Sequence, residues 1–191
     1  LQYLMDSPAE FSSFSLRTFT VADPSRVVEG PTFRLAVHHD GSEAQLDRFA
    51  VDVETIVRES VAIFGEFPEY EPGTYTFIAD YLRYASGDGM EHRNSTVLTS
   101  SGSLENQRRA LLSTVAHELF HSWNVERIRP QALEPFDFER ANVSGELWLG
   151  EGFTSYYDDL IMARTGLANL SETVASVSRV INAVQHSPAR R

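Results

Sequence analysis

The stretch "TVAHELFHSWNVERIRP", residues 114–130, places two histidines and a glutamate on a predicted helix. Positions i and i+4 of a helix project from the same side, so His117 and His121 can direct their imidazoles at one metal ion. Glu118 lies about 100° further round the helix, where it reaches a water on that ion but not the ion itself. This division of roles is typical of a metallopeptidase.

An ordinary amphipathic helix is the alternative interpretation of the same stretch. Four apolar side chains fall on one stripe and predict a packed helix with or without a metal: Leu112, Val115, Leu119 and Trp123. The two interpretations differ in what the histidines need, since two buried neutral imidazoles in adjacent turns each require a hydrogen-bond partner. A third ligand elsewhere in the chain would favour the metal site.

The third protein ligand that a catalytic zinc needs is predicted at Glu151, in "LWLGEGFTSYYDD", residues 147–159. A glutamate near a helix N-terminus is also favoured by the helix dipole alone. Aromatic neighbours favour the ligand interpretation, because they are expected to bury this turn and a buried carboxylate needs a partner or a cation. These neighbours are Trp148, Phe153, Tyr156 and Tyr157. Glu146 competes for the role but is expected to be exposed. Asp158 lies on the same predicted helix as Glu151. It either accepts a hydrogen bond from a ligand imidazole and orients it, or is an exposed acid.

Length, composition and charge are those of one soluble globular domain. The 191 residues are 42% hydrophobic, and 16 basic against 27 acidic residues leave a formal charge of -11. This charge argues against a nucleic-acid or anionic-membrane surface. The absence of cysteine excludes disulfides and thiolate ligands, and no apolar run approaches the roughly 20 residues that span a bilayer. The sequence fits a cytoplasmic and a periplasmic or secreted location equally, and it does not indicate an oligomeric state.

Periodicity along the chain predicts an α+β fold. Strands are expected at 11–21, 32–38, 74–80 and 95–100, and a loop with Gly and Asp follows the third. A long amphipathic helix is expected at 43–64, and three further helices near 104–124, 147–165 and 170–185. Pro130 is expected to end the first of these three, and Arg127 or Arg129 to pair with local acids.

Three motifs in order resemble the glycyl aminopeptidase family of zinc metallopeptidases, which are gluzincins. They are "GDGMEHRNSTVL" at 87–98, "HELFHSWNVERIRP" at 117–130 and "LWLGEGFTSYYDDLIMARTG" at 147–166. The resemblance covers about residues 80–165, with weaker similarity through "LMDSPAEF". It implies a thermolysin-like catalytic domain that binds one Zn²⁺ and removes N-terminal glycine or small residues from peptides.

The resemblance also implies roles for single residues. His117, His121 and Glu151 would hold the zinc, and Glu118 would act as general base. Glu91, in "GMEH", would bind the N-terminal ammonium of the peptide substrate. The alternative for Glu91 is a solvated loop acid, paired with Arg93.

The same resemblance divides the chain at residue 30. Residues 1–30 are expected to be the end of, or the linker from, a preceding β-domain, and residues 31–191 a thermolysin-like catalytic domain without its C-terminal part. The tyrosine that stabilises the oxyanion is expected beyond Arg191, so we expect poor turnover by this chain alone. Two alternatives stay open: a zinc endopeptidase of the same clan, and a non-catalytic peptide-binding domain with a structural metal site.

Overall fold

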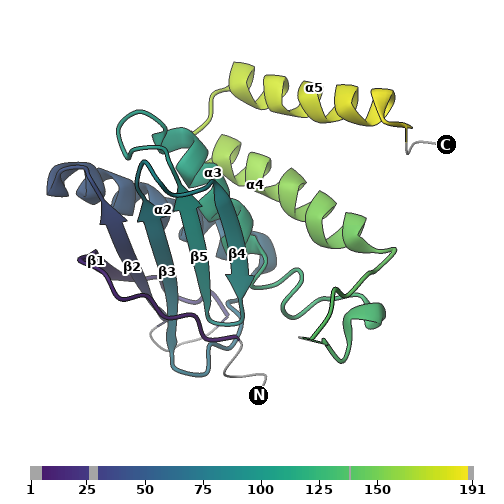
Figure 1. Ribbon diagram of the computed structural model, residues 1–191, viewed down its shortest axis with the longest axis horizontal. Coiled ribbons are helices and arrows are strands. Elements are labelled where there is room, and N and C mark those ends of the chain that lie inside the picture. Colours follow the sequence, from purple (N-terminus) through teal and green to yellow (C-terminus); the bar gives the residue numbers. More distant parts are fainter. Residues whose placement is uncertain (1–5, 26–29, 138, 189–191) are drawn as a thin grey trace.

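A five-stranded mixed sheet forms one layer of the computed structural model, which describes residues 6–25, 30–137 and 139–188 (Figure 1). The strand order is β1-β2-β3-β5-β4. The strands are β1 (Ser15–Thr20), β2 (Thr32–His39), β3 (Thr74–Tyr81), β4 (Asp88–His92) and β5 (Ser95–Ser100). β2, β3 and β5 run parallel, and β1 and β4 pair antiparallel with β2 and β5. The α+β class predicted from the sequence is confirmed, while its thermolysin-like arrangement stays a prediction.

The edge strand β4 corrects the sequence prediction, which placed a loop between the third and fourth expected strands. Asp88–His92 is short and contains Gly89, so it lacks the β-branched and aromatic residues that mark a strand. Its extended form comes from antiparallel pairing with β5, in which Glu91 lies opposite Thr96. Thr96 is fully buried, so this register turns Glu91 toward the helical layer.

Helix α2 (Glu43–Phe64) follows the predicted bounds of 43–64. Ser42 and Gln45 form a capping box at its start, and Gly65 ends it with a φ of 82° that suits glycine. Its predicted apolar side chains are all buried against the sheet or the neighbouring helices: Leu46, Phe49, Val53, Ile56, Val57 and Val61.

Of the three predicted C-terminal helices, only the first is clearly shorter than the sequence predicts. α3 spans Arg108–Phe120, and hydrogen-bonded turns continue from His121 toward Ile128, so the helix ends before Pro130 is reached. A short 3₁₀ helix, η1, covers Gln131–Leu133. The predicted helix at 147–165 consists of a π-helical turn, η2 (Trp148–Gly152), and α4 (Phe153–Arg164). α5 spans Leu170–His186 and begins with a capping box at Asn169.

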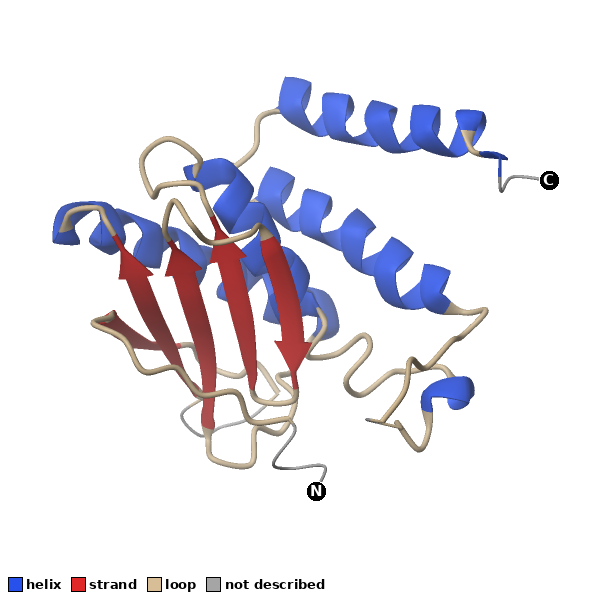
Figure 2. Ribbon diagram, viewed as in Figure 1, coloured by secondary structure: helices blue, strands red, loops and turns tan. Residues whose placement is uncertain are grey.

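The helices α2 and α3 cover one face of the sheet, and α4 packs against α3 (Figure 2). The predicted stripe lies in the core: Leu112, Val115 and Leu119 on α3, and Trp123 in the turns after it, are each at most 6% exposed. α5 lies apart from the sheet and contacts α4 (Figure 1). None of the described helices combines the length and the apolar character that a membrane crossing requires.

The predicted division at residue 30 stays a prediction. Residues 15–20 form β1, which pairs with β2 within the one sheet. Residues 1–5 and 26–29 of the predicted N-terminal part lie outside the described residues.

Candidate metal centre

Three of the predicted side chains converge between α3 and the π-helical turn η2. Glu151 Oε2 lies 3.3 Å from His117 Nε2 and 3.6 Å from His121 Nε2. The ligand atoms of a tetrahedral zinc lie about 3.4 Å apart, because each is about 2.0–2.2 Å from the ion. Two imidazole nitrogens and one carboxylate oxygen, all within 4.8 Å of one another, therefore fit the donor set and the spacing of a zinc site. Their role as ligands stays a prediction.

Both histidines use their other ring nitrogen for a hydrogen bond within the protein. His117 Nδ1 lies 2.8 Å from Asp158 Oδ2, and His121 Nδ1 lies 2.7 Å from the backbone oxygen of Asn124. An acceptor at Nδ1 holds a proton on that nitrogen and turns Nε2 toward Glu151. The sequence alternative in which Asp158 is an exposed acid is wrong, since this residue is 9% exposed.

The charges around the two histidines favour a cation between them. Burial lowers the pKa of His117, but its hydrogen bonds with Asp158 and Glu151 outweigh this effect and raise the pKa to about 10. The hydrogen bonds with His117 and His121 hold the pKa of Glu151 far below its usual value. Glu151 is therefore an anion that stabilises positive charge at both imidazoles, whether that charge is a proton or a metal.

The π-helical turn that carries Glu151 is fixed to α3 by Asn124. The side-chain amide of Asn124 donates to the backbone oxygens of Leu149 and Gly150, at 2.9 and 3.1 Å, and to Thr154 Oγ1 at 3.2 Å. Its backbone oxygen also accepts from His121. Asn124 thus links the position of Glu151 to the orientation of His121, a role that the sequence analysis missed because the side chain carries no metal-binding group.

The aromatic residues around Glu151 contradict the burial argument made from the sequence. Trp148 is 65%, Phe153 44% and Tyr156 60% exposed, and the Glu151 side chain itself is 57% exposed. Tyr157 alone packs inward, stacked on Phe120. No described element covers this side of η2, so proximity to the histidines, and not burial, distinguishes Glu151. Glu146 is exposed and accepts a hydrogen bond from Ser144.

Glu118 lies on the side of α3 that faces the edge strand β4. It is 6% exposed, and burial raises the pKa of its carboxyl to about 7. The side chain passes directly over Gly89 of β4, where a Cβ atom would lie 2.6 Å from Glu118 Cδ and 2.8 Å from Glu118 Cγ. The missing side chain of Gly89 therefore provides the space that Glu118 occupies.

Glu91 approaches the same region from β4. One carboxylate oxygen each of Glu91 and Glu118 and one ring nitrogen of His121 lie within 4.8 Å of one another. Arg93, the alternative partner of Glu91, bonds Glu71 Oε1 through its Nε at 2.5 Å. A carboxylate that faces α3 is thus available at the end of the edge strand.

The basic segment after α3 forms the expected ion pairs with local acids through Arg129. Arg129 pairs with Glu126 and Glu134. Arg127 instead donates to the backbone oxygens of Arg93, Ser122 and Glu69 and lies over the ring of Tyr70.

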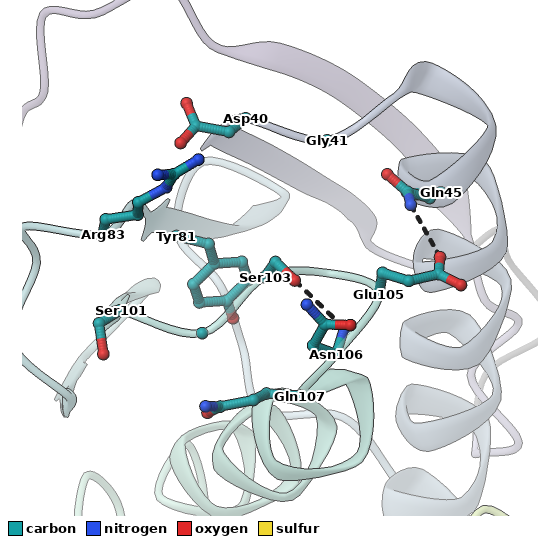
Figure 3. A pocket seen from close by; sticks show the side chains of 11 residues that line it. Asp40, Gly41, Gln45, Tyr81, Arg83, Ser101, Ser103, Glu105, Asn106 and Gln107 are labelled. Atoms are coloured by element: carbon teal, nitrogen blue, oxygen red, sulfur yellow. Dashed lines mark hydrogen bonds between the residues drawn. The ribbon is translucent and has the colours of Figure 1, made fainter.

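A separate cleft of about 460 Å³ opens at the carboxyl ends of the parallel strands (Figure 3). It lies at the amino-terminal end of α3, whereas the two histidines lie at the carboxyl end of that helix. Its wall includes Tyr81, Arg83 and Gln45, and Gln45 donates to Glu105 across it at 2.7 Å. It shares no residue with the candidate metal centre.

Comparisons with known proteins show that this chain is similar to aminopeptidases. The profile of the M61 glycyl aminopeptidases matches residues 110–191. Leucine aminopeptidase 2 from Vanderwaltozyma polyspora is 32% identical over 115 residues, and the Saccharomyces cerevisiae protein of the same name is 32% identical over 114. The crystal structure of an aminopeptidase N family protein from Idiomarina loihiensis superposes with a TM-score of 0.67 at 27% identity over 82% of this chain.

The matched regions are a small part of these relatives. The alignments span 15% and 14% of the two leucine aminopeptidases and 26% of the Idiomarina loihiensis protein. The resemblance to the glycyl aminopeptidases that the sequence motifs indicated is confirmed.

Proposed function

Because this chain is related to the glycyl aminopeptidases, we propose that it carries the metal centre of a zinc-dependent aminopeptidase. The carrying observation is the convergence of His117 Nε2, His121 Nε2 and Glu151 Oε2. A zinc bound by these atoms supplies Lewis-acid chemistry, polarising the scissile carbonyl and making a water more acidic. Three protein ligands leave a coordination position open, as catalytic zinc sites require.

Glu118 is the general base in this proposal. It follows the first histidine on α3, and its carboxylate lies beside the proposed ligand His121, where it would reach a water on a bound zinc. It accepts a proton from the attacking water and returns it to the departing amine of the cleaved peptide. Asp158 and the backbone oxygen of Asn124 hold the two imidazoles in one tautomer and orientation.

The exopeptidase character rests on Glu91 and the edge strand. The outer edge of β4 is not paired with another described strand, so it offers backbone groups to an extended peptide. At the end of such a peptide, Glu91 binds the free N-terminal ammonium and fixes its distance from the scissile bond. A preference for glycine or small residues at that position follows from the family and is part of the proposal.

Zinc content tests the metal centre without depending on turnover. We expect His121→Ala and Glu151→Ala to lose about one tightly bound zinc per chain and Glu118→Gln to keep it. Glu146→Ala is the matched control for Glu151→Ala. Loss of zinc in Glu146→Ala but not in Glu151→Ala would show that Glu146, and not Glu151, is the third ligand.

Hydrolysis of paired peptides tests the aminopeptidase assignment. A glycyl peptide and its N-acetylated form are compared on wild type, Glu118→Gln and Glu91→Ala. Glu118→Gln should abolish both activities, and Glu91→Ala should damage cleavage of the free peptide with little effect on zinc. Equal cleavage of the acetylated peptide by wild type would indicate an endopeptidase, and activity independent of Glu118 would indicate a non-catalytic metal site.

A further inference from the structure

A second group of metal-binding side chains lies on the face of the sheet that the helices leave uncovered. It consists of Glu10, His38 and Asp80, none of which the sequence analysis assigned to a function. His38 Nδ1 lies 3.0 Å from Asp80 Oδ1 and 3.9 Å from Glu10 Oε1. All three ligand atoms lie within 4.8 Å of one another. These two distances lie on either side of the roughly 3.4 Å that separates the ligand atoms of a tetrahedral zinc.

The sheet itself fixes two of the three side chains. His38 on β2 and Asp80 on β3 are partners in the parallel register, and side chains of adjacent strands at the same register point to the same face. Their neighbours Val37 and Ala79 are fully buried on the helical side, which places His38 and Asp80 on the opposite side. Strand pairing therefore positions this donor pair in advance.

The third side chain comes from the N-terminal segment, residues 6–14, which crosses in front of the sheet (Figure 1). Asp6 holds the start of this segment against the end of the edge strand β4. Its carboxylate lies 3.1 Å from His92 Nδ1 and accepts from the backbone N–H of Arg93. Glu10 anchors its middle, and the hydroxyl of Ser12 donates to the same Glu10 Oε1. The segment thus delivers a carboxylate to the donor pair.

The charge of this group is not balanced by the surrounding protein. Among the described residues, no arginine lies within ion-pairing distance of Glu10 or Asp80, so the two carboxylates share the single imidazole of His38. Asp80 Oδ1 is shielded from solvent and lacks a hydrogen bond of good geometry among the described residues. A divalent cation would balance the two negative charges and satisfy this oxygen.

We propose that Glu10, His38 and Asp80 form a second zinc site, with a structural role. One imidazole nitrogen and two carboxylate oxygens suit Zn²⁺, and water completes the coordination on the half-exposed side. Because its ligands come from the N-terminal segment and two strands, the ion clamps residues 6–14 onto the open face of the sheet. The site is independent of the metal centre on α3, with which it shares no residue.

Counting bound zinc by elemental analysis after equilibration at fixed micromolar free zinc tests the site. His38→Ala should bind one zinc fewer than wild type, and Glu10→Gln should bind one fewer as well. The side chains of both residues are about one quarter exposed, so neither substitution opens the core. His39→Ala is the matched control, because its Nδ1 accepts from the backbone N–H of Gly41 and does not belong to the group.

The count separates this site from the one on α3. Combining His38→Ala with His121→Ala should remove two zinc ions when each single change removes one. The proposal is overturned if His38→Ala and Glu10→Gln bind as much zinc as His39→Ala, which would leave His38 as an ion-pair partner of the two carboxylates. Chymotrypsin cleavage after Phe11, which is 98% exposed, gives a second readout. Zinc should slow this cleavage in wild type and not in His38→Ala, and equal slowing in both would contradict the clamp.

Discussion

The substitution Gly89→Ala tests whether the space over Gly89 positions Glu118, the proposed general base. A Cβ atom at residue 89 would lie 2.6 Å from Glu118 Cδ and 2.8 Å from Glu118 Cγ, with the carboxylate oxygen Oε1 closer still. Carbon atoms in contact are separated by about 3.5–4.0 Å, so the Glu118 carboxylate must retreat by about 1 Å. A displacement of about 1 Å of a reacting group costs on the order of 100-fold in rate, or about 2.7 kcal/mol of transition-state stabilisation.

The backbone tolerates this change. Gly89 does not have a positive φ, so alanine can adopt its conformation, and the atoms in its way belong to a side chain that can rotate. The three atoms nearest to the new methyl group all belong to Glu118 and not to a proposed metal ligand. We therefore expect Gly89→Ala to fold, to keep its zinc and to lose about 100-fold in kcat/KM on a glycyl peptide.

Gly87→Ala is the matched control, because a Cβ at residue 87 meets no atom within 4 Å. A crystal structure of Gly89→Ala would report the displaced Glu118 carboxylate directly, without reference to turnover. Equal kcat/KM for the two alanine variants, with Glu118→Gln inactive, would refute the positioning argument. Loss of zinc in Gly89→Ala would show that the effect passes through the metal ligands instead.

Three further changes probe the supports of the site and the core. Asn124→Ala removes the amide that holds η2 against α3, and zinc titration should show an affinity about 10- to 100-fold weaker than wild type. Asp158→Asn weakens the acceptor at His117 Nδ1 and should lower zinc affinity about 10-fold in the same titration, whereas Asp159→Asn should not change it. Leu119→Ala empties a fully buried position and should lower the free energy of unfolding by about 2–5 kcal/mol in urea denaturation. Leu170→Ala, at a position 80% exposed, should change it by less than about 0.5 kcal/mol.

Sequence periodicity predicted the helices and strands that are specified by their own residues. The apolar spacing of 43–64 and the capping residues Ser42 and Gly65 give α2 the same bounds in the sequence and in the structure. β4 was missed because its form depends on pairing with β5 and not on local propensity. The helix expected at 104–124 extends only over Arg108–Phe120, since the following residues turn to bring His121 toward Asn124.

The sequence predicted which residues of the candidate site come together, but not their burial or their supporting contacts. The spacing of His117 and His121 and the resemblance around Glu151 identified three groups that the structure brings together. The burial argument for Glu151 was wrong because it assumed a cover that the described residues do not provide. Contacts such as Gly89 with Glu118 have no sequence signal, since they join residues from separate elements.

The π-helical turn η2 makes the candidate metal centre sensitive to the deletion of a single residue within that turn. Such a turn holds one residue more than an α-helical turn, and η2 is followed without a break by α4. Loss of a single codon within Trp148–Gly150 would let the turn relax to regular α-helix and rotate the start of the segment by about 100° relative to α4. Asn124 would then lose its acceptors on the turn, and the carboxylate would lose its register with the two imidazoles. One in-frame deletion is thus expected to leave the fold intact and to disrupt the candidate metal centre.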